Sequence, residues 1–145
     1  MTEAEIERIG RGFSDLSLPA ADFSHFGHWA AVVWLLCRAT PSDVARDMPG
    51  MIRRFNEAKG GVNSDTEGYH ETITQASIAA AAALQSGSAE QTFARILSGD
   101  LARSDWLLRH WRKETLFGVL ARRAWVAPDL EALPFDVLNS VTEKS

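Results

Sequence analysis

Apolar residues recur every three or four positions along most of the chain, which is the spacing of helices that bury one face. Alternation of apolar and polar residues, typical of half-buried strands, is nearly absent. The pattern predicts four longer helices, over about 2–15, 24–39, 41–59 and 67–85, the last beginning at Glu67 or Tyr69. Shorter helices are expected near 88–97, 104–112 and 114–125.

Local signals support several of these helix ends. Thr2 with Glu5, and Ser88 with Gln91, have the spacing of a capping box, in which two side chains satisfy backbone N–H groups of the first turn. Pro49 lies inside the third helix. Because proline lacks an N–H and crowds the preceding turn, a kink or a break is expected there.

The order of these elements predicts the fold class. We expect an all-α protein, an antiparallel bundle of about four longer helices with short additional C-terminal helices. The segment from about 126 to 145 is expected to be an extended arm that packs and then frays. Residues 1–145 are expected to form a single domain, long enough to bury roughly two thirds of the surface of the unfolded chain.

Charge and composition limit the partners. The net charge is −4 and the isoelectric point about 5.5, so neither nucleic acid nor an anionic membrane is an expected partner. The apolar run 29–37 is too short to span a bilayer, and the N-terminus lacks the pattern of a signal peptide. A single cysteine, Cys37, suits a reducing compartment, and a cytoplasmic location is expected. The expected partner is a small molecule of unknown identity, and homo-oligomerisation stays open.

Two histidines stand at the start of the second predicted helix. On a helical projection His25 and His28 lie on the apolar stripe that Val32 and Leu36 continue. Each ring therefore needs a partner, because an unsatisfied buried imidazole costs on the order of 1–3 kcal/mol. A backbone carbonyl would satisfy each ring separately. Residues three apart on a helix are also close enough to bind one ion together.

A third histidine, His70, falls in the first turn of the fourth predicted helix. If the second, third and fourth helices are antiparallel neighbours, the second and fourth run in the same direction and their N-termini share one end of the bundle. The positive end of a helix dipole favours a neutral, ligating imidazole. The small residues that follow, Thr74 and Ser77, either allow close helix packing or leave room for a ligand.

The leading hypothesis is a metal-binding protein or a small metal-dependent enzyme. Its ligands would be His25, His28 and His70, which suit a divalent ion such as zinc, iron or manganese. Glu71 would be a fourth ligand or a general base, and Tyr69 would orient a substrate. Two alternatives remain: acid/base chemistry or small-ligand binding without a metal, and a non-enzymatic helical interaction module with a satisfied histidine core.

Two C-terminal features carry weaker signals. His110 follows Trp106 by one helical turn, so stacking or exposure is expected rather than ligation. The segment 103–123 holds six basic and two acidic residues, which could bind an anionic group or single-stranded nucleic acid. A solvated helix face whose arginines extend into water is the better explanation.

Three motifs together resemble a family of small, all-helical bacterial proteins of unassigned function. They are Phe23-x-His25-x-x-His28, "YHETIT" from Tyr69, and "ARRAWVAPDLEALP" near the end of the chain. The resemblance runs from about Asp22 to Pro134. It implies an all-helical fold and no particular activity.

The metal hypothesis has a direct test. Protein purified without a histidine tag is expected to carry a divalent ion, and His70→Ala is expected to lower the metal content. Sub-stoichiometric metal that His70→Ala leaves unchanged, and that reconstitution does not raise, would contradict the hypothesis.

Overall fold

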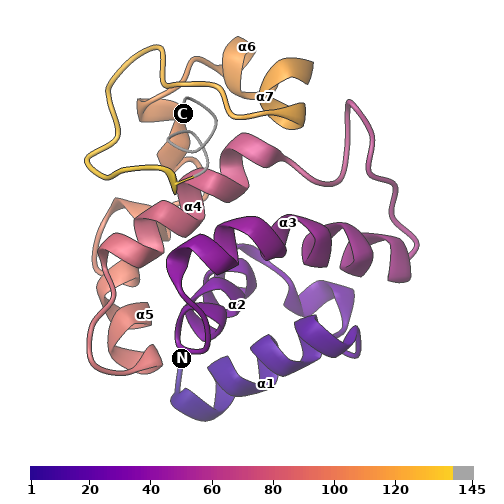
Figure 1. Ribbon diagram of the computed structural model, residues 1–145, viewed down its shortest axis with the longest axis vertical. Helices are drawn as coiled ribbons and strands as arrows, with labels where there is room; N and C mark the ends of the chain where they lie inside the picture. Colours follow the sequence, from indigo (N-terminus) through magenta and orange to yellow (C-terminus); the bar gives the residue numbers. More distant parts are fainter. Residues whose placement is uncertain (139–145) are drawn as a thin grey trace.

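The computed structural model describes residues 1–138, and in this range the chain is all-helical, without a β-strand (Figure 1). The fold class predicted from the sequence is confirmed. The α-helices are α1 (Glu3–Asp15), α2 (His25–Leu36), α3 (Pro41–Ala58), α4 (Glu71–Ala83), α5 (Ala89–Leu97), α6 (Lys113–Leu116) and α7 (Val119–Arg123). Three 3-10 turns, η1 (Ala20–Asp22), η2 (Asp100–Ala102) and η3 (Trp106–Arg109), complete the described elements.

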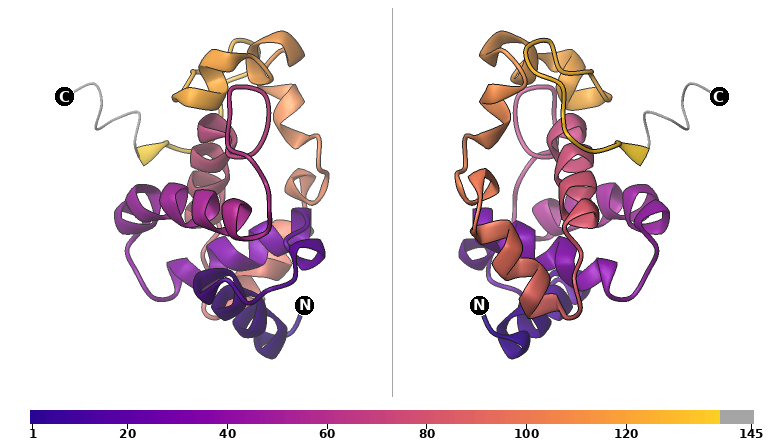
Figure 2. Two further views of the ribbon diagram at one scale, coloured as in Figure 1. Left: turned by 90° about the vertical axis from the view of Figure 1, so that its right-hand side faces the viewer. Right: turned by 90° about the vertical axis from the view of Figure 1, so that its left-hand side faces the viewer.

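Helix α2 lies at the centre of the packing because it is apolar on nearly every side. The run from Trp29 to Val33 is buried without interruption, and Leu36 is buried as well. A helix without a polar face has to be covered all round. Helices α1, α3, α4 and α5 all contact it. The short helices α6 and α7 lie at the opposite end of the molecule from α1 (Figures 1 and 2).

The predicted N-terminal caps of two helices are confirmed, and the predicted start of the fourth helix is wrong. Thr2 and Ser88 form the two predicted capping boxes, and Ser24 caps α2. Helix α4 begins at Glu71 rather than at Glu67 or Tyr69. The cause is His70, whose backbone is extended and whose side chain takes the cap position.

The C-terminal third is more irregular than predicted. A single helix over 104–112 is replaced by the 3-10 turn η3, and the stretch 114–125 is divided between α6 and α7. The segment 124–137 contains no helix or strand, and Leu130 N–H donates to the carbonyl of His110 at 2.9 Å. The predicted arm therefore packs where it is described, and its residues 139–145 lie outside the described range.

Helix α3 continues through Pro49 rather than breaking there. Proline at this position cannot donate to the carbonyl of Ala45, four residues earlier. The side chain of Gln75 from α4 donates to that carbonyl instead, with Nε2 3.1 Å from the oxygen. Both residues are only 1% exposed, so the neighbouring helix supplies a donor to a buried carbonyl that the proline cannot serve.

None of the helices in residues 1–138 combines the length and the apolar character needed to cross a membrane.

The contact between Gln75 and Ala45 predicts a coupling between α3 and α4. Gln75→Leu is expected to lower the free energy of unfolding by about 1–3 kcal/mol, because it leaves a buried carbonyl without this donor. In a Pro49→Ala background residue 49 regains an N–H for Ala45, so the same substitution should cost about 1 kcal/mol less. Urea denaturation of the four proteins measures both values. Equal costs in the two backgrounds would contradict the coupling.

Candidate functional site

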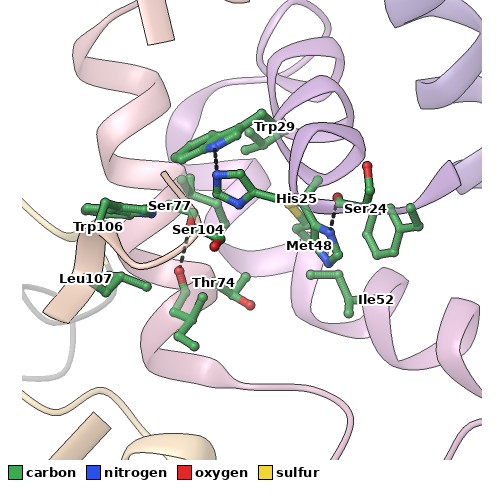
Figure 3. A pocket seen from close by; sticks show the side chains of 15 residues that line it. Ser24, His25, Trp29, Met48, Ile52, Thr74, Ser77, Ser104, Trp106 and Leu107 are labelled. Carbon is green, nitrogen blue, oxygen red and sulfur yellow. Dashed lines mark hydrogen bonds between the residues drawn. The ribbon is translucent and has the colours of Figure 1, made fainter. Parts of the chain in front are cut away.

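A pocket of about 310 Å³ lies where the first turns of α2 and α4 meet the middle of α3 (Figure 3). The segment 104–107 forms its remaining wall. Most of the lining is apolar or aromatic: Phe23, Trp29, Val32, Met48, Ile52, Ile73, Ile78, Trp106 and Leu107. The polar lining residues are Ser24, His25, His28, Thr74, Ser77 and Ser104. The first turns of the second and fourth helices therefore lie close together, as the sequence predicted.

The turn before α2 is shaped by close backbone approach. Ser24 Oγ accepts from the N–H of Gly27 at 3.2 Å, which caps the helix. A Cβ at Gly27 would overlap the carbonyl oxygen of Asp22, so only glycine fits there. Asp22 itself lies outside the helix in η1 and pairs with Arg8 at 3.2 Å. This tight entry sets His25 and His28 in the first turn, on the wall of the pocket.

His28 presents one unprotonated nitrogen to its surroundings. Its Nδ1 lies 2.8 Å from the carbonyl oxygen of Ser24, and since a carbonyl only accepts, Nδ1 carries the proton. The ring stacks on Phe23 with centroids 3.6 Å apart. The residue is accessible to solvent on a concave wall, yet protein atoms surround the ring densely.

The pKa of His28 follows from this environment. The dense surroundings lower the pKa below the ordinary histidine value, the bond to Ser24 opposes this, and the nearby His25 lowers the pKa further. The neutral ring therefore prevails at pH 7, with Nδ1 protonated. Nε2 has no hydrogen bond to any residue in 1–138, so its lone pair is free to accept one.

The ring of His25 is hydrogen-bonded to a backbone carbonyl of a distant segment. Its Nε2 donates to the carbonyl of Leu101 at 3.0 Å, and the indole N–H of Trp29 donates to the same oxygen at 3.2 Å. The two ring nitrogens approach each other to 3.4 Å, the contact drawn in Figure 3. Two donors on one carbonyl tie the turn η2 to the first turn of α2.

His70 is fully occupied as a structural residue. Its Nδ1 accepts from the N–H of Ile73 at 3.2 Å, which caps α4, and its Nε2 donates to the carbonyl of Leu116 at 2.6 Å. Burial lowers the pKa of His70, the bond to Leu116 opposes this, and the charge of Arg122 lowers the pKa further. With both nitrogens in hydrogen bonds, the neutral ring has no lone pair left for a metal.

The three predicted metal ligands are thus only partly brought together. His25 and His28 line the 310 Å³ pocket, whereas His28 and His70 line a neighbouring hollow of about 600 Å³. Within residues 1–138, no group of three or more His, Cys, Asp or Glu side chains is arranged to hold a metal ion. Metal binding stays a prediction, and the contacts of the three rings favour the alternative in which backbone carbonyls satisfy them.

Tyr69 and Glu71, the residues predicted to act on a substrate, bind each other. The phenol O–H of Tyr69 donates to the carboxylate of Glu71, and the guanidinium of Arg53 lies 4.4 Å from the centre of the phenol ring. Burial, followed by the charge of Glu71, raises the pKa of Tyr69 well above its ordinary value. Neither residue lines the 310 Å³ pocket. Their catalytic roles stay predictions that this geometry does not favour.

The C-terminal features also have structural partners. His110 is buried, donates from Nδ1 to the carbonyl of Glu131 at 2.8 Å, and packs edge-on against Trp106. Most of the basic residues of 103–123 are bound to neighbouring groups, which agrees with a structural role for the segment. The contacts are Arg103 with Asp105, Arg109 with Asp100 and Glu131, Arg122 with the carbonyls of Gly68 and Tyr69, and Arg123 with Asp65.

The segment that closes the pocket was missed at the level of sequence. Ser104, Trp106 and Leu107 form a wall of the pocket, although they are some 80 residues from His25 and His28. The apolar pair Trp106 and Leu107 fits any buried segment, so it gave no signal for a ligand. Room beside Thr74 and Ser77 was expected as one of two explanations for their small size, and both residues line the pocket.

Comparisons of this chain with family models, with curated proteins and with solved structures found no match. The resemblance to a family of small helical bacterial proteins therefore stays a prediction.

The histidine environments predict how stability depends on pH. The pKa values of His28 and His70 are lowered in the folded state, so below about pH 6.5 the unfolded chain binds more protons than the folded one. The contribution of these histidines to the free energy of unfolding is therefore expected to be complete near pH 7 and to fall as the pH drops from 6.5 towards 5.

His70→Asn should reduce that slope. Asparagine retains a good N-cap but is too short to reach Leu116, so the variant should also lose about 1–3 kcal/mol at pH 7. Urea denaturation at pH 7, 6 and 5 measures both effects, and His28 accounts for the slope that remains. An identical slope in the variant and the unaltered chain would exclude His70 as its source.

Proposed function

We propose that this chain binds a small, mainly apolar molecule in the pocket between α2, α3 and α4, without a metal ion. The observation that carries the proposal is a 310 Å³ pocket with aromatic walls into which few polar groups converge. Pockets of about 300–1,000 Å³ with such a lining are typical of small-molecule sites. An imidazole with an unused nitrogen, that of His28, stands on the wall.

The lining also indicates the polarity of the ligand. No Asp, Glu, Lys or Arg is among the described residues around this pocket. A charged ligand would lose its hydration there without gaining an opposite charge, which is strongly unfavourable. Aromatic and aliphatic contacts from Phe23, Trp29 and Ile52 supply the favourable term instead, in proportion to the apolar area that the ligand covers.

This proposal takes the metal-free alternative of the three hypotheses raised by the sequence. A metal site would need a third ligand, and the cap position of His70 removes the one expected. A purely structural histidine core would leave neither an open pocket nor an unused imidazole nitrogen. His28 Nε2 could also accept a proton from a bound molecule, but binding is the function on which the geometry bears directly.

The proposal is tested by blocking the pocket. Ser104 is exposed and lines the mouth, so Ser104→Phe is expected to fill the entrance and to weaken binding of small aromatic probes at least about tenfold. Toluene, phenol and benzyl alcohol are suitable probes. Trp29 and Trp106 line the pocket, so their fluorescence reports occupancy, and ligand-observed NMR gives an independent measurement.

The matched control is Ser14→Phe, an exposed serine of α1 away from this pocket, which should bind the probes as the unaltered chain does. Binding should also survive dialysis against a chelator. Three results would contradict the proposal: no saturable binding of any probe, equal binding by Ser104→Phe and Ser14→Phe, or binding that requires a metal.

A further inference from the structure

The positions of protons in the pocket indicate which ligands its polar groups can recognise. On α2, His28 uses its one N–H on the carbonyl of Ser24, and Nε2 keeps a lone pair. The nitrogen is fixed in direction, because the ring is held by that bond and by its stacking on Phe23. On this side the pocket offers an acceptor.

The hydroxyl groups on α4 have the same character. Thr74 Oγ1 donates to the carbonyl of His70 at 2.8 Å, and Ser77 Oγ donates to the carbonyl of Ile73 at 2.7 Å. Each hydroxyl has a single proton, which is thereby held within the helix, while its oxygen keeps lone pairs. Figure 3 shows both side chains on the pocket wall. From α4, too, the pocket offers acceptors.

The donors around the pocket are already engaged. His25 Nε2–H and the indole N–H of Trp29 both point at the carbonyl of Leu101. The hydroxyls of Ser24 and Ser104 remain, and both residues are exposed at the rim, where water serves them. Apart from these two hydroxyls, the described lining can accept hydrogen bonds but has no free proton to donate.

This asymmetry narrows the ligand class. An anion finds only lone pairs facing it, and a cation finds no carboxylate in the lining. A neutral acceptor, such as an ether, leaves the acceptors of the pocket unpaired when it displaces their water. Resting on the proposed function, we infer that the pocket selects a neutral aromatic molecule that donates a hydrogen bond, that is, a phenol or an aromatic alcohol.

The test compares probes of similar shape that differ in the proton they carry. Phenol is expected to bind about three- to tenfold more tightly than anisole or toluene, the range for one net hydrogen bond. Benzoate is expected not to bind measurably. Affinities are measured by NMR titration at pH 7.5, where phenol is neutral.

His28→Phe identifies the acceptor. Phenylalanine keeps a flat ring next to Phe23 but removes Nε2, so the ratio of phenol to anisole affinity should fall towards one while anisole still binds. Ser14→Phe again serves as the control that preserves the ratio. If His28→Phe retains a tenfold preference for phenol, the assignment of His28 as the acceptor is wrong.

A measurement on the unaltered chain tests the same point if the variant does not fold. Protonation turns Nε2 of His28 into a donor, so the preference for phenol should weaken or reverse once the pH is low enough for NMR to show the His28 ring protonated. Other groups also titrate or carry charge near His28, namely His25 on α2, and Lys59, Glu67, Tyr69 and His70 around the neighbouring hollow. Both probes are neutral throughout, but His25 lines the same pocket, so its protonation is followed by NMR in the same titration and separated from that of His28.

The outcomes separate this inference from the proposed function. If anisole or toluene binds as tightly as phenol at pH 7.5, the pocket binds small apolar molecules but does not select a donor, and only the inference fails. If none of the three binds, the proposed function fails with it. A preference for phenol that is unchanged at a pH where NMR shows the His28 ring to be protonated would contradict the role of His28.

Discussion

The structure depends on the burial of α2. Between Trp29 and Leu36 this helix offers almost no polar side chain to water, so four other helices have to surround it. Its first turn is different, because Ser24, His25 and His28 are polar and need hydrogen-bond partners at the point where the apolar covering ends. The pocket lies at this boundary between a fully apolar helix and its polar beginning.

Backbone carbonyls, rather than a metal ion, satisfy the three predicted ligands. The carbonyls of Ser24, Leu101 and Leu116 accept from His28, His25 and His70, respectively. Two of these bonds join distant parts of the chain. His25 links η2 to the start of α2, and His70 links α6 to the start of α4. Only His28 donates within its own turn, and its Nε2 has no hydrogen-bond partner within residues 1–138.

Local chemistry explains which parts of the fold could be predicted from the sequence. The caps at Thr2 and Ser88 were recognised because a hydroxyl needs only the next turn to act as one. Histidine is not among the favoured N-cap residues, and α4 was therefore expected to start before His70. The shared end of α2 and α4 followed from helix order alone.

The rest of the site could not be predicted because it depends on contacts between distant segments. The turn η2 has little helical pattern of its own, and it is held by the bonds that His25 and Trp29 make to Leu101. A sequence pattern shows that His70 faces inward but not that both of its nitrogens find backbone partners. The three histidines therefore looked like a complete set of metal ligands in the sequence, although both nitrogens of His70 are hydrogen-bonded to the backbone.

The bond from Gln75 to Ala45 has a consequence for how the protein opens. Helix α3 is uninterrupted at Pro49 while α4 lies against it, since the carbonyl that the proline cannot serve receives its donor from α4. Detaching α4 would remove that donor from the middle of α3 at the same moment. The two helices therefore belong to one cooperative unit of unfolding, and amide protons in the centre of α3 should exchange with solvent together with those of α4.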